Sequence, residues 1–447
     1  MNQDLTRGPV MGGLLRFAVP MIMGDLLQQC YNIADTLIIG RCLGPNALAA
    51  VGSSFTLMTF LTSILLGLCM GSGTVFSIRF GQRDEKGLQE GVLAAFALVA
   101  GLTAVLIAAA FASLDGIRVF LSVPGEVWGM MREYLFVIYT GIFAVFLYNF
   151  FASFLRAVGN SVVPLGFLAV SAVLNIVLDL WFVIGLNRGV AGAAEATVIS
   201  QYLSGLGIMA YTLIKFPQLR PKKGLCLRLG SVRQIAGFSV LTCVQQSVMN
   251  LGILLVQGLV NSFGPTVMAA FAAAVKVDAF AYMPVQDFGN AFSTYIAQNY
   301  GAGEEERIRK GLRGAVISAF AFCIVVSALV FIFAGPLMGL FVEAGESAII
   351  AEGVVYLRIE GAFYWGIGCL FLLYGLYRGL GRPGMSVVLT VVSLGTRVAL
   401  AYILAGPVGV TGIWWAVPIG WVLADLVGLV YYLLRVKKPL PKEHKLK

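Results

Sequence analysis

Long apolar stretches recur along the whole chain, and they constrain its fold more than any other feature. The mean hydropathy is +0.88, and 59% of the residues are hydrophobic while only 12% are charged. A soluble domain carries about 25% charged residues, and no soluble core grows large enough to bury so much apolar surface. The composition therefore predicts an integral membrane protein and excludes a disordered chain, a soluble enzyme and a nucleic-acid-binding protein.

The apolar stretches have the length of membrane-spanning helices, each of which needs about 20 residues. The sequence predicts twelve spans and therefore an all-α membrane protein. The spans are expected at about 14–39, 47–80, 88–114, 127–151, 161–186, 190–214, 234–262, 266–299, 310–334, 350–377, 384–405 and 410–434.

Basic residues gather in one set of connecting segments. An even number of spans puts both termini on the same side, and the segments of that side hold most of the Lys and Arg residues. The opposite side holds only Arg41, Arg118, Arg132 and Arg188. Because cytoplasmic loops carry an excess of Lys and Arg, we expect both termini in the cytoplasm. The same rule explains the net charge of +9 without a nucleic-acid partner.

The sequence lacks the residue patterns of several kinds of catalytic, metal-binding and ATP-binding site. The single histidine, His444, lies in the basic tail, so imidazole metal sites and His-activated nucleophiles have no partner among the spans. The seven cysteines are scattered without C-x-x-C spacing and are expected to be packing residues. No phosphate-binding G-x-x-x-x-G-K-[ST] motif occurs, so ATP does not drive the chain directly. An enzyme is therefore disfavoured.

The two halves of the sequence repeat each other at a nearly constant offset. The matching pairs are LGPNALAAV (43–51) with FGPTVMAAF (263–271), RFGQRDEK (79–86) with NYGAGEEE (299–306), LRAVGN (155–160) with YRGLGR (377–382), and GVAGAA (189–194) with GVTGIW (409–414). Six spans in each half make the repeats parallel, related by a pseudo-twofold axis along the membrane normal, as in many secondary transporters. A duplicated channel that does not couple transport is the alternative.

The repeat predicts the domain organisation. We expect a six-helix N-terminal lobe at 1–214, a basic cytoplasmic linker at 215–233, and a six-helix C-terminal lobe with a basic tail at 234–447.

Carboxylates inside the first lobe are the main functional candidates. Asp25, Asp35, Asp179 and Glu195 fall within predicted spans, and no Lys or Arg lies deep in the same spans. A charge at this depth costs several kcal/mol, so each group must hold a proton, bind a cation or face water. Glu195 lies near the start of its span and is expected to be structural.

Helical spacing groups some of these residues. Gln28, Asn32 and Asp35 share one face of the first span, and Asn175 and Asp179 share one face of the fifth. Both faces can line a cavity or form a packing network between helices. Asp25 lies roughly 80° around the helix from Asp35, so a place at the cavity edge and a structural role are equally consistent with its position.

The second lobe mixes both signs of charge. Charged residues in or near its spans are Lys276, Asp278, Asp287, Glu360, Arg397 and Asp425. Arg397 occupies the repeat-equivalent place of Asn175. A structural network of ion pairs is one interpretation. The other is a second ion or substrate site around Asp287, Glu360 and Arg397.

Taken together, several motifs resemble the multidrug and toxic compound extrusion (MATE) family. They are NIADTLIIGR (32–41), LGPNALAAVG (43–52), LRAVGNSVVPL (155–165), NIVLDLWFVIGL (175–186), GVAGAAEATVISQ (189–201) and MPVQDFGNAFSTYIAQNYGAG (283–303). The closest similarity is to the bacterial branch that includes the DNA-damage-inducible (DinF) proteins. This resemblance implies a monomeric, two-lobed exporter of the bacterial plasma membrane that exchanges protons or sodium ions for amphipathic organic cations, without any other cofactor.

The resemblance also implies roles for individual residues. In the resembling branch, residues matching Asp35, Asn175, Asp179 and Thr197 form a proton- or cation-linked network, which could hold sodium between the two acids. The first helix, interrupted here by Pro20, is implied to bend when this network changes protonation. The sodium-driven branch carries an acid in its seventh helix, but residues 231–262 contain none.

Aromatic and methionine side chains can bind flat organic cations through cation–π and apolar contacts. Tyr31, Phe154 and Met283 are the candidates for cavity lining, although most such residues face lipid or the core. A flippase for lipid-linked saccharides is the alternative function within the same superfamily. A flippase is expected to need a cationic cavity for phosphates, whereas the first-lobe spans hold acids.

Overall fold

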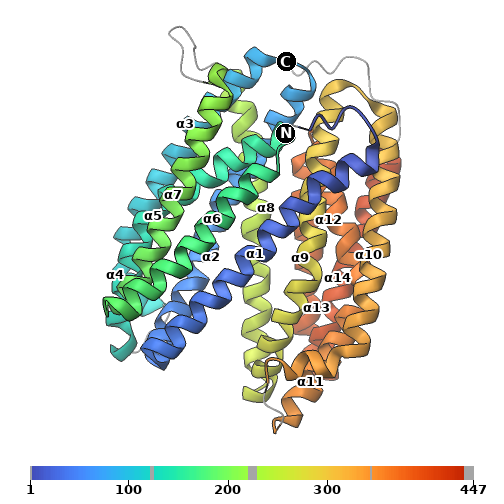
Figure 1. Cartoon of the computed structure of the whole chain (residues 1–447). Coiled ribbons are helices and arrows are strands. Elements are labelled where there is room, and N and C mark those ends of the chain that lie inside the picture. The colour runs from blue at the N-terminus through green and yellow to red at the C-terminus, as the bar shows by residue number, and fades with distance from the viewer. Residues whose placement is uncertain (1–2, 121–124, 220–228, 343–344, 437–447) are drawn as a thin grey trace. The chain divides into compact units, whose positions relative to one another are not determined.

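The computed structural model describes residues 3–120, 125–219, 229–342 and 345–436 (Figure 1). These residues form helices and no β-strand, which confirms the all-α prediction. Within them, eleven helices are long and apolar enough to cross a membrane, and a bent pair of shorter helices makes a twelfth span. The bent pair is α11 (Ser347–Gly361) with α12 (Tyr364–Gly379), which replaces the continuous helix expected at 350–377.

The helices pack into two compact units. Unit 1 contains Met1–Asp4 and Val19–Cys243, and unit 2 contains Leu5–Ala18 and Val244–Lys447. The helices entirely within unit 1 are α2 (Pro45–Gly81), α3 (Glu85–Ala112), α4 (Leu114–Phe120), α5 (Gly125–Ala157), α6 (Val162–Asp179), the π-helical turn η1 (Leu180–Gly185), α7 (Gly189–Lys215) and the short η2 (Pro217–Leu219). Those entirely within unit 2 are α9 (Pro265–Ala302), α10 (Glu305–Gly339), α11, α12, α13 (Pro383–Val408), α14 (Val410–Tyr431) and η3 (Tyr432–Val436).

Two long helices contribute residues to both units. The first turns of α1 (Val10–Leu43) belong to unit 2, and the first turns of α8 (Leu229–Asn261) belong to unit 1. The units therefore divide inside these helices, whereas the sequence predicted a division at the linker 215–233. Contacts decide where a unit ends, and the loop sequence does not report them. Residues 220–228 of that linker lie outside the described part of the chain.

The backbone repeats the internal duplication found in the sequence. Left-handed residues occur at matching places in the two halves, with Gly44 and Gly264 each followed by the proline that starts a helix. The other matching pairs of positive φ are Arg83 with Gly303, Gly159 with Gly381, and Gly189 with Gly409. Glycine reaches this conformation without a steric penalty, so the repeated glycines fix equivalent turns.

Within unit 1, the start of α8 packs closely against the middle of α2. A Cβ atom on Gly71 would lie 2.5 Å from the Phe238 carbonyl oxygen, and one on Gly67 would lie 2.4 Å from the Cα of Cys243. Beside them, the hydroxyl groups of Ser72 and Ser239 are 2.8 Å apart and share a hydrogen bond. Small residues permit this close approach, as is common between helices in membranes.

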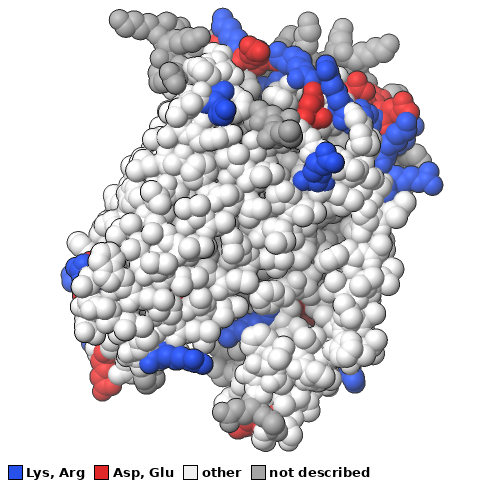
Figure 2. Space-filling model, in the orientation of Figure 1, with Lys and Arg blue, Asp and Glu red and all other residues white. Residues whose placement is uncertain are grey.

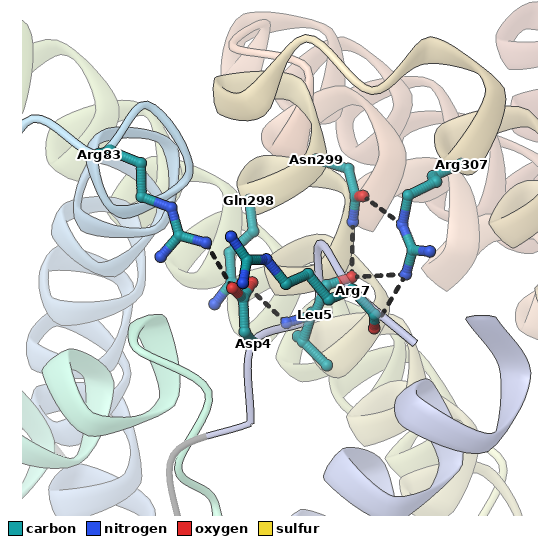
Figure 3. Close-up of polar contacts among 7 residues, drawn as sticks. All are labelled: Asp4, Leu5, Arg7, Arg83, Gln298, Asn299 and Arg307. Carbon is teal, nitrogen blue, oxygen red and sulfur yellow. Dashed lines mark hydrogen bonds and ion pairs between the residues drawn. The ribbon is translucent and has the colours of Figure 1, made fainter. Parts of the chain in front are cut away.

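The segment before α1 passes from unit 1 to unit 2 between Asp4 and Leu5, and each part bonds within its own unit (Figure 3). In unit 1, the Asp4 carboxylate pairs with Arg83. In unit 2, the Leu5 N–H donates to Gln298 Oε1 at 3.1 Å, and the Leu5 carbonyl accepts from Asn299 at 3.2 Å. Arg307 also donates to the carbonyl oxygens of Leu5, Arg7 and Gly8.

The outer surface of the helices fits a lipid environment. On the face drawn in Figure 2, uncharged side chains cover the middle of the helices, and charged side chains gather toward helix ends. Large apolar side chains such as Val173, Ile324 and Ile332 are more than half exposed. A soluble protein rarely leaves so much contiguous apolar surface in water.

Because α2 packs closely on α8, we expect the stability of the protein to depend strongly on the size of the side chain at this contact. We expect Gly71→Ala to lower the stability of the purified protein by about 1–3 kcal/mol, because the added methyl group meets the Phe238 backbone. Thermal unfolding in detergent measures the change. Gly101→Ala is the matched control, since nothing lies within 4 Å of its added Cβ. Equal stability of the two variants would contradict the packing described here.

Candidate functional site

A polar cluster lies inside unit 1, where three helices meet. Asp35 comes from α1, Asn175 and Asp179 come from one face of α6, and Thr197 comes from α7. Asn175 and Asp179 are only 3% and 0% exposed. The structure thus brings together the four residues that the family resemblance grouped, although their role in coupling stays a prediction.

One hydrogen bond links α6 to α7. The Asn175 amide Nδ2 donates to Thr197 Oγ1 at 3.3 Å, and the Thr197 hydroxyl donates to the Ala193 carbonyl at 3.1 Å. The hydroxyl group therefore uses its proton within its own helix and is left to accept from Asn175. The amide oxygen of Asn175 is buried without a partner.

The carboxyl groups of Asp35 and Asp179 lie near each other. Both oxygens of Asp179 and the Oδ1 atom of Asp35 are buried with no donor. Two ionised carboxylates offer only acceptors, so they can bond to each other only when one of them carries a proton. Among the described residues, no Lys or Arg pairs with either acid. Chemically, such an acid pair can take up a proton or a small cation.

Two further features surround the acid pair. Tyr134 on α5 is buried and lies close to both Asp35 and Asp179. Immediately after Asp179, α6 widens into the π-helical turn η1, a deviation often found at functional sites. Tyr134 gave no signal in the sequence, because an aromatic residue in an apolar helix forms no pattern of its own.

The other candidate residues of α1 differ in their exposure and in their neighbours. Tyr31 lies beside Gln28 and within the electrostatic influence of Asp35, whereas Gln28 itself is largely exposed. Asn32 is half-buried, and its carbonyl accepts from the Thr36 hydroxyl at 2.8 Å. Asp25 lies near Tyr148 of α5, away from the pair. Pro20 lies inside α1, which continues as a helix on both sides of it.

Two of the other candidates, Glu195 and Phe154, make contacts that are typical of structural residues. Glu195 forms an ion pair with Arg188 at 2.6 Å, in keeping with its expected structural role. Phe154 is 1% exposed and packs edge-on against Phe76 and Phe216, so it belongs to the core of unit 1 and was wrongly selected as a cavity residue. Met283, on α9 of unit 2, is half-buried.

Charged residues of unit 2 form a second cluster, with one change from the prediction. Glu360 and Arg397 lie together as expected, but the acid beside them is Asp278 and not Asp287. Asp287 lies about two and a half turns further along α9 and therefore on the opposite face of that helix. Spacing alone could not show which face of α9 meets α11.

The described residues contain no group of three or more His, Cys, Asp or Glu side chains that could hold a metal ion. No disulfide links the cysteines among them, and Cys369 lies beside Asp425. Cys226 and His444 lie outside the described residues.

Comparison with known proteins identifies the family. The model of the MatE family matches residues 20–181 and, a second time, residues 242–403, in agreement with the internal repeat. The chain belongs to the MatE family. Within it, the chain is 30% identical to the probable multidrug resistance protein YpnP of Bacillus subtilis, with 96% of each chain covered. It is 25% identical to the multidrug export protein MepA of Staphylococcus saprophyticus, over 98% of this chain and 96% of that protein.

Solved structures support the same architecture for this MatE chain. A crystal structure of MATE in complex with MaL6 superposes with a TM-score of 0.88 at 24% identity, covering 97% of this chain and 98% of the other. An outward-facing multidrug resistance MATE transporter of the MOP superfamily also gives 0.88 at 24% identity, with 97% of each chain covered. The closer similarity to the DNA-damage-inducible branch stays a prediction.

Because Glu195 is held in an ion pair with Arg188, we expect it to be dispensable for transport. We expect Glu195→Gln to leave transport unchanged and to lower stability by less than about 1 kcal/mol, because its partner Arg188 is half exposed. Growth under drug challenge and thermal unfolding measure the two effects. A loss of transport in a correctly folded Glu195→Gln protein would place Glu195 in the coupling machinery.

Proposed function

We propose that this MatE-family chain is a secondary active multidrug exporter that exchanges protons for amphipathic organic cations. The observation that carries the proposal is the Asp35–Asp179 pair, which lies at membrane depth without a basic partner among the described residues. The names of its relatives, multidrug resistance and multidrug export proteins, support the same activity. No enzymatic step is part of this proposal.

The coupling follows from the charge of the pair. When Asp35 and Asp179 lose their shared proton, two negative charges in a dry site attract a cationic substrate. When a proton enters from the outside, the charge falls and the substrate is released. Each ligand shifts the conformational equilibrium only by its differential affinity for the two states, so proton and substrate must favour opposite states.

Neighbouring residues would transmit the change of charge. Asn175 can donate to an ionised carboxylate or accept from a protonated one, and Thr197 holds its amide in place. The helix that carries Asp35 also contains Pro20, where the missing backbone hydrogen bond allows bending. In this proposal, proton binding changes the packing of α1 through that point.

The proposed setting is the bacterial plasma membrane, with both termini in the cytoplasm and the chain acting as a monomer. Substrates enter from the cytoplasm or the inner leaflet. Sodium in place of the proton at Asp35 and Asp179 is the alternative coupling ion. A lipid-linked saccharide flippase is disfavoured, because the polar cluster of unit 1 is acidic and would repel a diphosphate.

The first test removes one carboxyl group of the pair. We expect Asp35→Asn to abolish drug resistance in cells without lowering expression. With one carboxyl group left, the site can no longer alternate between the doubly charged pair that binds the cation and the protonated pair that releases it. Minimum inhibitory concentrations of an organic cation measure the effect, with Glu195→Gln as the matched control. A fully active Asp35→Asn protein would rule out the proposed role.

The second test follows the proton directly. We expect Asp179→Asn to lose most of the proton movement that substrate addition triggers in vesicles containing the wild-type protein. A pH-sensitive dye inside the vesicles measures the movement. Wild-type proton release by the variant would remove Asp179 from the coupling pathway.

The coupling ion can be identified with imposed gradients. Vesicles loaded with a fluorescent organic cation receive either a proton gradient or a sodium gradient, each at the same membrane potential. Efflux driven by the proton gradient alone supports the proposal. Efflux driven only by sodium would assign the pair to that ion instead.

A further inference from the structure

A cavity opens on unit 1 at the end where α5 and α7 begin. Its volume is about 500 Å³, and both helices line it. The α5 side is formed by residues between Gly129 and Val137, and the α7 side by Arg188, Ala191 and Glu195. None of the four residues of the polar cluster lines it. The proposed function therefore leaves this cavity without a role.

Small residues shape the space between the two helices. Deeper in the unit, α5 and α7 touch: a Cβ atom on Gly141 would lie 2.9 Å from a methyl carbon of Val198, and one on Gly205 would lie 2.8 Å from the Ala144 carbonyl oxygen. Near the start of α5, nothing lies within 4 Å of a Cβ atom on Gly129. The cavity thus lies beyond the close contact, where room is left at the helix starts.

The cavity carries two charges of each sign, from Arg132, Glu133, Arg188 and Glu195. Arg188 pairs with Glu195 at 2.6 Å, and Arg132 Nε pairs at 3.1 Å with Asp115, which lies outside the cavity. Among the described residues, Glu133 has neither a hydrogen bond nor an ion pair. A ligand therefore meets one free carboxylate and the remaining N–H groups of two guanidinium groups.

These charges favour a zwitterion. A simple anion would lie against Glu133 and Glu195, and a simple cation would lie against Arg132 and Arg188. A molecule with a phosphate and a primary ammonium group can instead accept from the guanidinium groups and donate to the Glu133 carboxylate, and both kinds of bond are charge-assisted. No side chain caps the start of α7, so its first N–H groups add a partial positive charge that favours the phosphate.

The surroundings of the cavity are those of the membrane interface. Its residues belong to the first turns of two membrane-spanning helices, and Trp181 of η1, at the same end of the unit, is more than half exposed. Exposed tryptophans are typical of the headgroup level. Phe136, in the lining, is also more than half exposed, and Phe143 and Ile199 continue the exposed apolar faces of α5 and α7 toward the middle of the span. These side chains offer a surface to acyl chains.

We propose that the cavity between the starts of α5 and α7 binds phosphatidylethanolamine from the surrounding bilayer. The phosphate lies on Arg132 and Arg188, the ammonium group lies on Glu133, and an acyl chain runs along Phe136. With both termini in the cytoplasm, this lipid belongs to the outer leaflet. Lipid binding here goes beyond the proposed exporter function and does not require that the chain export a substrate.

Native mass spectrometry of the full-length protein, purified in detergent and freed of lipid, tests the site. The protein is titrated with phosphatidylethanolamine, phosphatidylcholine or phosphatidylglycerol, all with the same acyl chains. We expect phosphatidylethanolamine to bind about tenfold more tightly than phosphatidylcholine, because the methylated ammonium group has no N–H to donate to Glu133. Phosphatidylglycerol, which has no ammonium group, should also bind more weakly.

Three variants divide the headgroup into its parts. Glu133→Gln should remove most of the preference for phosphatidylethanolamine and leave the affinity for phosphatidylcholine unchanged. Arg132→Gln should weaken both lipids by a similar factor, because both carry the phosphate. Glu133 and Arg132 are exposed, so the fold should tolerate both changes. Glu126→Gln, at an exposed position of α5 outside the cavity, is the matched control and should change neither affinity.

Equal affinity of the wild-type protein for phosphatidylethanolamine and phosphatidylcholine, or an unchanged preference in Glu133→Gln, would overturn the proposal. Binding of chain-free glycerophosphoethanolamine as tightly as the lipid would also overturn it, because the cavity would then hold a soluble zwitterion. Displacement of the lipid by an organic cation in the wild-type protein but not in Glu133→Gln would assign the cavity to transport substrates instead. None of these measurements involves transport, so failure of the exporter function is distinguished from failure of the lipid site.

Discussion

The cost of a carboxylate at membrane depth is the constraint on which the structure of this protein depends. Insertion of such a charge costs several kcal/mol, and it persists only where a proton, a cation or water compensates it. In unit 1, Asp35 and Asp179 lie near each other, and no guanidinium among the described residues pairs with either of them. Their arrangement therefore requires an exchangeable positive charge, which is the property that an ion-coupled exporter needs.

In unit 2, a basic residue lies beside the buried carboxyl groups and offsets part of their charge. Asp278 and Glu360 share their surroundings with Arg397, so a single proton suffices to neutralise them. Removing one partner from such a buried group of charges is strongly destabilising, whereas the complete group is close to balanced. The two units thus compensate their buried acids differently, although the fold of each carries the same internal repeat.

The sequence predicted the spans, the duplication and the face shared by Asn175 and Asp179, because hydropathy and helical periodicity are local signals. It did not predict the break between α11 and α12, nor which face of α9 lies beside Glu360, and so Asp287 was selected in place of Asp278. These features depend on contacts between distant helices.

The bonding of the first residues has a practical consequence for work on this protein. The Gln3 N–H donates to the Gly159 carbonyl at 2.9 Å, and the next residues are held by Arg83 and Arg307. A fluorescent or affinity tag fused directly to the amino terminus would crowd a segment that is already fully engaged. A tag at this end therefore needs a long flexible spacer that keeps it clear of the bonded residues.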